Sequence, residues 1–298
     1  MSRFARISGR LFNAPLMLRP EKAEMLCAAL VDRLGIAKLD TIDGRSLEAS
    51  QLRLQASDWM DEEDAVTPAR RQYVIEQRVA RIPINGTLVH KLGGVSPWSG
   101  MVGYDCLEKI VADAQANKEV GALLLDIDSP GGEVAGCFAF ARRLATMGRR
   151  AGGKPIIAFA NEMACSAAYA IASSCDAVMT TDTGMVGSIG VYTMLVDMTK
   201  GLDKNGLKVT MVRAGERKAR GGPYEAADKQ TMDKLMAWVD DTWTIFADHV
   251  AANRPISAGA VKAMEGDWFT GSDALDIGLV DAVDSPEAIF EAVAALAR

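Results

Sequence analysis

The segment at residues 120–127 constrains the fold most, because it is almost wholly apolar and is followed by a glycine turn and then a helical pattern. Leu123, Leu124 and Leu125 leave no polar face, which is typical of a strand buried on both sides of a parallel sheet. The same succession recurs along the chain. Strands are predicted at residues 79–89 (two strands and a turn), 155–160, 177–180, 190–196 and 208–212, and helices at 104–117, 133–147, 164–173 and 225–253. Alternating strands and helices predict an α/β fold whose sheet carries helices on both faces.

The first 70 residues precede this pattern and are expected to form an N-terminal extension. Pro20 lies in the first turn of a predicted helix that continues to about Leu34, with acidic residues near its N-terminus. An acidic cluster at residues 58–64, followed by Pro68, is interpreted either as a linker or as a solvated charged face. Residues 71–298 then form the main domain, in which small helices surround residues 267–271.

Composition excludes several classes of protein. The 298-residue chain has a formal net charge of −6, so no basic surface for nucleic acid is expected. Its five cysteines are widely spaced without a C-x-x-C pair, which indicates reduced buried thiols in a cytoplasmic protein. Two histidines are too few for a His-rich metal site, and neither a metal nor a cofactor is expected.

No targeting or membrane segment is expected either. The basic residues at the N-terminus precede no apolar stretch, which argues against a cleaved secretion signal. The apolar segment at residues 156–179 is interrupted by Asn161, Glu162 and Asp176, so it is predicted to divide into strand, helix and strand rather than span a bilayer.

Three polar features suggest hydrolytic chemistry. Ser166 lies in the small-residue segment 163–169, the glycine turn at residues 128–132 offers free backbone N–H groups, and Lys218 lies in a glycine-bounded polar loop. These are a nucleophile, an oxyanion site and an amine base. Each has a plain alternative: a serine in an Ala-rich helix usually packs against its own backbone, and a loop lysine is usually solvated.

The segments at residues 127–132, 163–169 and 187–191 resemble the three signature segments of the signal peptide peptidase A family. The resemblance runs from about residue 78 to 283. The opening segment 12–18 resembles the corresponding segment in one branch of this family, the branch that contains the head maturation proteases of tailed phages. The family implies a crotonase-like or Clp-protease-like spiral of ββα units and a serine endopeptidase with a Ser–Lys dyad, without a cofactor.

The resemblance also implies roles for individual residues. Ser166 becomes the nucleophile and Lys218 the general base, and Ser188 either orients the lysine amine or is a turn residue. The implied oxyanion and substrate-binding residues are Gly131, Gly132, Ala167, Ile189 and Gly190. An extended substrate would add along residues 132–134 and 189–191.

Other assignments stay open. Lys204 and Lys208 are rival amines, and Cys165 is interpreted as core rather than as a nucleophile because a thiolate needs a cationic neighbour. The phage branch implies capsid, portal or scaffold proteins as substrates, a place within the prohead, and a homo-oligomer. The alternatives are a bacterial signal-peptide-peptidase-like enzyme and a non-catalytic structural head protein on the same fold.

Overall fold

The computed structural model describes residues 16–18, 38–40, 46–48, 72–92, 95–96 and 100–298. The helix predicted near residues 20–34 and the linker at residues 58–68 lie outside the described residues, so the boundary at residue 70 stays a prediction. The chain divides into two compact units. One comprises Met17–Arg19, Glu63–Val191 and Trp243–Arg298, and the other comprises Met1–Leu16, Pro20–Glu62 and Tyr192–Thr242.

The first unit is built on a mostly parallel sheet whose strands follow the order of the chain. Strand β5 (Val79–Asn85) pairs with β9 (Ala122–Ser129), and β9 pairs with β11 (Ile156–Cys165). Beyond residue 160, β11 exchanges its neighbour β12 (Ala177–Thr180) for β13 (Met185–Gly187). At the edges lie β4 (Val74–Glu76), β14 (Trp268–Thr270) and β15 (Ala282–Val283).

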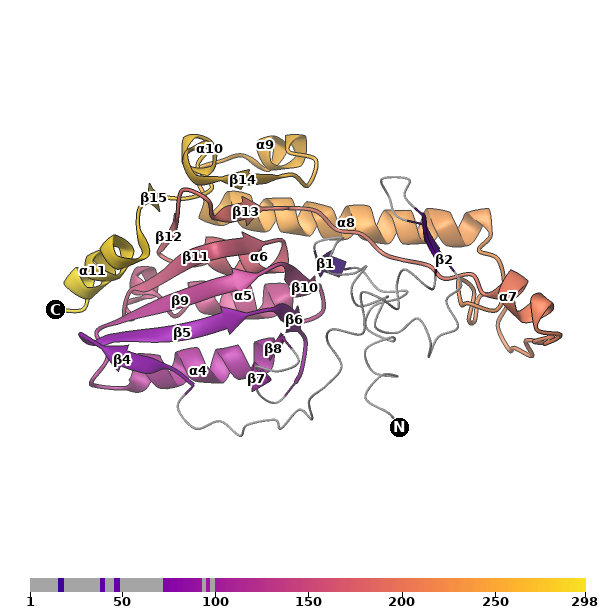
Figure 1. The fold of residues 1–298 in the computed structure, drawn as a ribbon, viewed down its shortest axis with the longest axis horizontal. Coiled ribbons are helices and arrows are strands. Elements are labelled where there is room, and N and C mark those ends of the chain that lie inside the picture. Colours follow the sequence, from indigo (N-terminus) through magenta and orange to yellow (C-terminus); the bar gives the residue numbers. More distant parts are fainter. Residues whose placement is uncertain (1–15, 19–37, 41–45, 49–71, 93–94, 97–99) are drawn as a thin grey trace. The chain divides into compact units, whose positions relative to one another are not determined.

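A second sheet collects the short strands that follow the long ones. Its order is β1 (Leu16–Leu18), β10 (Gly131–Glu133), β6 (Thr87–Val89), β8 (Met101–Gly103) and β7 (Val95–Ser96). The chain contributes to both sheets before each helix. β5 enters the first sheet and β6, β7 and β8 enter the second before α4 (Tyr104–Ala116), and β9 and β10 enter the two sheets before α5 (Cys137–Ala145). This succession confirms the predicted α/β spiral of ββα units (Figure 1).

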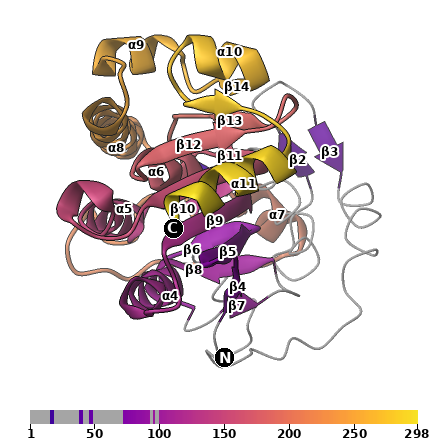
Figure 2. The ribbon, with the colours of Figure 1, turned by 90° about the vertical axis from the view of Figure 1, so that its left-hand side faces the viewer.

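Alternate side chains of the long strands enter two separate cores, because successive residues of a strand point to opposite faces. One core lies under α4, α5 and α6 (Ala167–Ser173), and the other lies under α11 (Pro286–Leu296) (Figure 2). Leu123 and Leu125 belong to the first and Leu124 to the second. Helices therefore cover both faces of the sheet, as the apolar strand pattern predicted.

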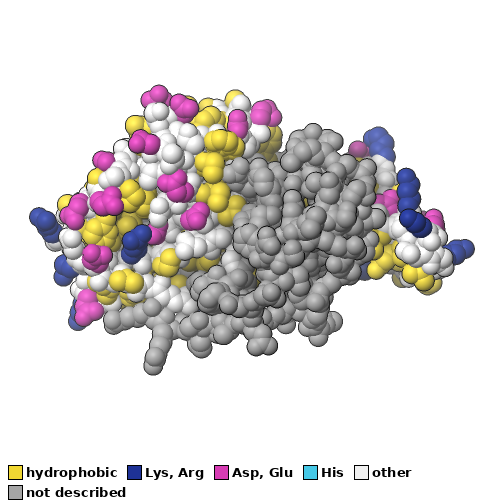
Figure 3. Space-filling model, in the orientation of Figure 1, with side chains coloured by type: hydrophobic (Ala, Val, Ile, Leu, Met, Phe, Trp, Pro, Cys, Tyr) yellow, Lys and Arg dark blue, Asp and Glu magenta, His cyan; other side chains and the backbone are white. Residues whose placement is uncertain are grey.

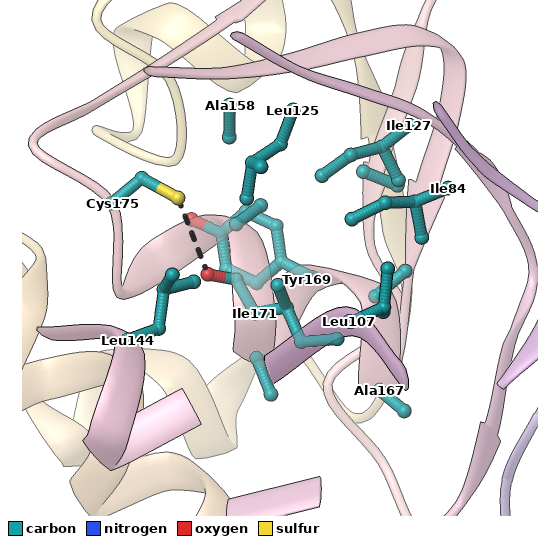
Figure 4. Close-up of a cluster of buried hydrophobic side chains, with 14 of the residues drawn as sticks. Ile84, Leu107, Leu125, Ile127, Leu144, Ala158, Ala167, Tyr169, Ile171 and Cys175 are labelled. Atoms are coloured by element: carbon teal, nitrogen blue, oxygen red, sulfur yellow. Dashed lines mark hydrogen bonds between the residues drawn. The ribbon is translucent and has the colours of Figure 1, made fainter. Parts of the chain in front are cut away.

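Tyr169 anchors α6 in the first core. Figure 4 shows its ring among Leu125 and Ile127 of the sheet and Leu107 of α4. The side chain is fully buried, and its hydroxyl donates a hydrogen bond to the carbonyl of Leu279 at 2.8 Å. Burial raises the pKa of the Tyr169 phenol, so it stays a donor at any physiological pH. The aromatic ring and its single satisfied polar atom fix the orientation of α6, whose first residue follows Ser166.

The remaining helices lie towards the C-terminus. They are α7 (Thr199–Lys204), α8 (Lys229–Asn253), α9 (Ala258–Ala263), α10 (Gly271–Asp276) and α11. The predicted small helices around residues 267–271 are confirmed. None of the helices in the described part of the chain has both the length and the apolar character needed to cross a bilayer.

Two predicted strands are wrong. Residues 190–196 and 208–212 form no strand, and only Tyr192 makes an isolated bridge, to Leu16. Val209 and Val212 are 41% and 95% exposed, so the apolar residues that suggested the second strand bury no face against a sheet. A strand needs such a buried face as well as β-branched residues.

Candidate active site

Ser166 lies in a sharp turn between strand β11 and helix α6. The predicted helix start at residue 164 is wrong, since β11 continues to Cys165 and α6 begins at Ala167. Ser166 itself has φ 57° and ψ −121°, a backbone conformation that residues other than glycine rarely adopt. Its N–H donates to the carbonyl of Gly187 at 2.7 Å, and its carbonyl accepts the N–H of Ala170 at 3.0 Å. These two bonds hold the strained residue in place.

The Ser166 hydroxyl is not used to cap the helix that follows it. Its side chain accepts no capping hydrogen bond from α6, although the residue occupies the N-cap position. The residue is 2% exposed, and Ala167 and Ala168 beside it are completely buried. A strained serine on a sharp strand-to-helix turn is also how α/β-hydrolases hold their nucleophile.

Ser188 lies beside Ser166 through the strand register. Cys165 of β11 is paired with Gly187 of β13, so the residues that follow them are neighbours at the carboxyl ends of two adjacent strands. Adjacent strands lie about 4.8 Å apart. Ser188 also has a positive φ of 51°, and its N–H donates to the carbonyl of Asp267 at 2.7 Å. Two serines with positive φ values therefore follow paired positions of adjacent strands.

Gly131 lies against Ser166 from the other side. A Cβ built on Gly131 would lie 2.9 Å from the Cβ of Ser166 and 3.0 Å from the carbonyl oxygen of Cys165, and it would collide with the carbonyl oxygen of Met17. The φ of Gly131 is +104°, which glycine alone adopts freely. Glycine is therefore required here both for its conformation and for the missing side chain.

The sequence offered no role for Ser129, yet it holds the glycine turn. Its buried hydroxyl donates to the carbonyl of Gly86 at 2.6 Å and accepts the N–H of Gly131 at 3.2 Å. The N–H of Gly131 is thus engaged. The N–H of Ala167, in the first turn of α6, has no acceptor within its own helix, which makes it the better placed of the two for an oxyanion.

The segment expected to form a second substrate edge is held in an irregular conformation. Ile189 is 1% exposed, and its carbonyl accepts the indole N–H of Trp243 at 2.8 Å. Gly190 donates its N–H to the carbonyl of Ser188 at 2.9 Å. The role of Trp243 could not be recognised in the sequence, where it is one member of a helical apolar stripe.

The cysteines of the described residues are buried and free of disulfides, as predicted. Cys165 has no exposed surface, and its thiol donates to the carbonyl of Met185 at 3.8 Å. Cys137 packs under α6 with its thiol towards the carbonyl of Ala167 at 3.7 Å, and burial raises its pKa to about 12. Both contacts are those of core thiols.

Lys218 belongs to the other compact unit, in an exposed turn between α7 and α8. Two ion pairs hold this loop: Arg213 with Glu225, at 2.9 and 2.5 Å, and Arg220 with Asp228. Hydrogen bonds from Arg213 lower the pKa of Glu225, which keeps the pair ionised. The rival amines Lys204 and Lys208 are exposed in the same unit, where Figure 3 shows Lys and Arg side chains gathered over α7. The pairing of Ser166 with Lys218 stays a prediction.

Comparison with known proteins shows which family the chain resembles. The model of peptidase family S49 matches residues 148–298. The chain is 35% identical to the head-tail preconnector protein GP5 of Enterobacteria phage P21 over 91% of this chain and 53% of that protein. It is also 35% identical to the capsid assembly protease C of Escherichia phage lambda, over 95% of this chain and 64% of that protein.

The chain therefore spans between about half and two thirds of the length of these two relatives. Among solved structures, an enoyl-CoA hydratase/isomerase family protein from Silicibacter pomeroyi aligns with a TM-score of 0.43 and 15% identity, over 76% of this chain and 81% of that one. The family match covers half of the chain and includes both Ser166 and Lys218. The chain belongs to peptidase family S49.

Proposed function

We propose that this chain is a serine endopeptidase in which Ser166 is the nucleophile and Lys218 the general base. One observation carries the proposal: Ser166 is held at φ 57° at the end of β11, with Gly131 pressed against it and its hydroxyl outside the capping of α6. Strain of this kind persists where the surrounding bonds fix it, and it collects at catalytic sites. The family of the chain supports the same reading.

In the proposed reaction, the amine of Lys218 takes the proton of Ser166, and the serine oxygen attacks the carbonyl carbon of the scissile bond. The oxyanion is bound by the N–H of Ala167, and the glycine turn at Gly131 and Gly132 lines the site beside it. The amine product leaves with a proton from the lysine, and water then hydrolyses the acyl-enzyme. Ser188, one strand away from Ser166, orients the lysine amine.

We further propose that the substrates are capsid, portal or scaffold proteins within a phage prohead, and that the enzyme acts as a homo-oligomer. The support is the similarity to one relative that is named as a capsid assembly protease. The other relative is named as a head-tail preconnector protein, which favours a non-catalytic structural role as the second candidate.

Labelling with a fluorophosphonate probe distinguishes the two candidates. A catalytic chain incorporates one probe at Ser166, identified by peptide mass spectrometry, whereas a structural protein incorporates none. Ser166→Ala should abolish labelling and casein cleavage without loss of stability. Ser272→Ala, which removes an exposed hydroxyl from α10, is the matched control and should change neither.

The dyad requires a separate test. Lys218→Arg keeps a positive charge but removes the base, because a guanidinium stays protonated at pH values below about 12. It should therefore be as inactive as Lys218→Ala, and Lys208→Arg should retain activity. Near wild-type turnover in Lys218→Arg would reject Lys218 as the base and leave the nucleophile assignment intact.

A further inference from the structure

Strand β1 brings a segment from the beginning of the chain to the edge of the second sheet. It contains only Leu16, Met17 and Leu18, and it pairs with β10, the strand that contains the glycine turn. All three residues are buried, and Met17 has no exposed surface. The Met17 side chain belongs to the hydrophobic cluster that also contains Leu88.

The backbone of β1 lies directly beside the proposed nucleophile. The carbonyl oxygen of Met17 and the Cβ of Ser166 both approach a single point, the position that a Cβ on Gly131 would take. A peptide carbonyl next to the reactive serine and the glycine turn is the arrangement that a bound substrate would have. Here the carbonyl comes from the chain itself.

The edge that β1 covers is also the one that an extended substrate needs. A peptide that adds to a sheet pairs with the exposed backbone of its outermost strand, and its alternate side chains enter pockets. One edge accepts one such strand at a time. With β1 paired to β10, that edge is occupied, and the buried Met17 side chain lies in the hydrophobic cluster beneath it.

The short length of β1 makes its release from β10 feasible. A strand of three residues forms few backbone hydrogen bonds, and short edge segments open with much less free energy than global unfolding requires. The central strands β9 and β11, which carry Ser129 and lead to Ser166, do not depend on β1 for their pairing.

We propose that residues Leu16–Leu18 act as an internal pseudosubstrate: they occupy the substrate-binding edge of β10, so the chain inhibits its own active site until this strand is displaced. This inference rests on the proposed function. It also defines the substrate class, because a displacing segment must be extended and must present a large apolar side chain at the position of Met17.

The test compares the rate of fluorophosphonate labelling of Ser166 in full-length variants. Met17→Asp places a charge in the apolar site, should release β1, and should raise the labelling rate by about tenfold or more. Met17→Ala loses apolar burial without adding a charge, should act in the same direction, and keeps the test valid if the aspartate variant does not fold. Val74→Asp, at an exposed position of another three-residue strand, is the matched control and should leave the rate unchanged.

A peptide of residues 13–21 supplies the converse measurement. Added to Met17→Asp, it should restore slow labelling, whereas the same peptide with Met17→Asp should not. Wild-type labelling rates in folded Met17 variants would overturn this inference and leave the proposed function intact. Cleavage of the wild-type chain at the Met17–Leu18 bond would overturn it as well, since the segment would then be a substrate. Absence of Ser166 labelling in every folded variant would overturn the proposed function itself.

Discussion

At the scale of single residues, the carboxyl end of β11 combines strain with close packing. Ser166 and Ser188 both have positive φ values, although neither is a glycine. Gly131 has a positive φ as well, and three backbone or side-chain atoms surround the place of its absent Cβ. Such positions are stable only because hydrogen bonds such as that from the Ser166 N–H to Gly187 hold them. The tightest of these positions is Gly131.

Gly131→Ala should therefore destabilise the chain and remove the nucleophile from its position. Left-handed strain and the clash with Met17 together should lower the free energy of unfolding by about 3–4 kcal/mol, measured by urea denaturation. Gly152→Ala is the matched control, because Gly152 has φ +81° but nothing within 4 Å of its Cβ position. It should cost about 1 kcal/mol. Equal losses in the two variants would show that the close contact has no effect.

At the scale of elements, the long buried strands and amphipathic helices were predictable, because their residue patterns repeat with the period of the structure. The apolar run at Leu123–Leu125 became the centre of β9, and the helix predicted at residues 104–117 is α4. The turn at Ser166 was not predictable, since small residues such as Ala164 suit a helix as well as a strand. β11 also changes register after Ala160, which no local pattern reveals.

Part of the candidate active site was also predictable from the sequence. Gly131, Ser166 and Ser188 came from motif resemblance, and the parallel register of β9, β11 and β13 brings them to one edge. Ser129 and Trp243 could not be recognised. Their contacts, to Gly86 and Gly131 and to Ile189, join segments that only the tertiary fold brings together.

Helix α8 is joined to α6 by a buried histidine. The Nε2 of His249 lies 3.0 Å from both the hydroxyl of Ser174 and the carbonyl of Ala170. Burial lowers the pKa of His249, the hydrogen bond to the Ala170 carbonyl opposes that shift, and the charge of Arg142 adds to it. The neutral imidazole is therefore the form that the folded state favours.

Stability should fall as the pH drops below about 6.5, because the unfolded chain binds a proton at His249 that the folded chain resists. The slope from this residue is at most about 1.4 kcal/mol per pH unit and ends below the depressed pKa. His249→Gln should reduce the difference in unfolding free energy between pH 7.5 and pH 5.5. His90→Gln, which replaces the other, exposed histidine, should keep it. An unchanged pH dependence in His249→Gln would assign it to other groups.

At the scale of the whole molecule, the apolar stripe of α8 indicates a partner. The stripe is buried at Phe246, half-buried at Val239 and exposed at Met236 and Met232, which are 60% and 45% exposed. Residues spaced by three or four share one face of a helix. Trp238 is 47% exposed but lies off this stripe, and Trp243 uses its indole N–H within its own unit.

An apolar stripe that continues into solvent is typical of a surface that another chain covers, and the proposed homo-oligomer supplies a second copy. Met236→Glu should therefore weaken self-association by about tenfold or more, because a buried unpaired carboxylate opposes assembly. Sedimentation velocity across a range of concentrations measures the change. Gln230→Glu adds the same charge on the opposite side of α8, where the side chain is exposed, and should leave the association unchanged. A wild-type chain that stays monomeric at micromolar concentration would reject the oligomer, and equal weakening by both variants would assign the effect to net charge instead of to the stripe.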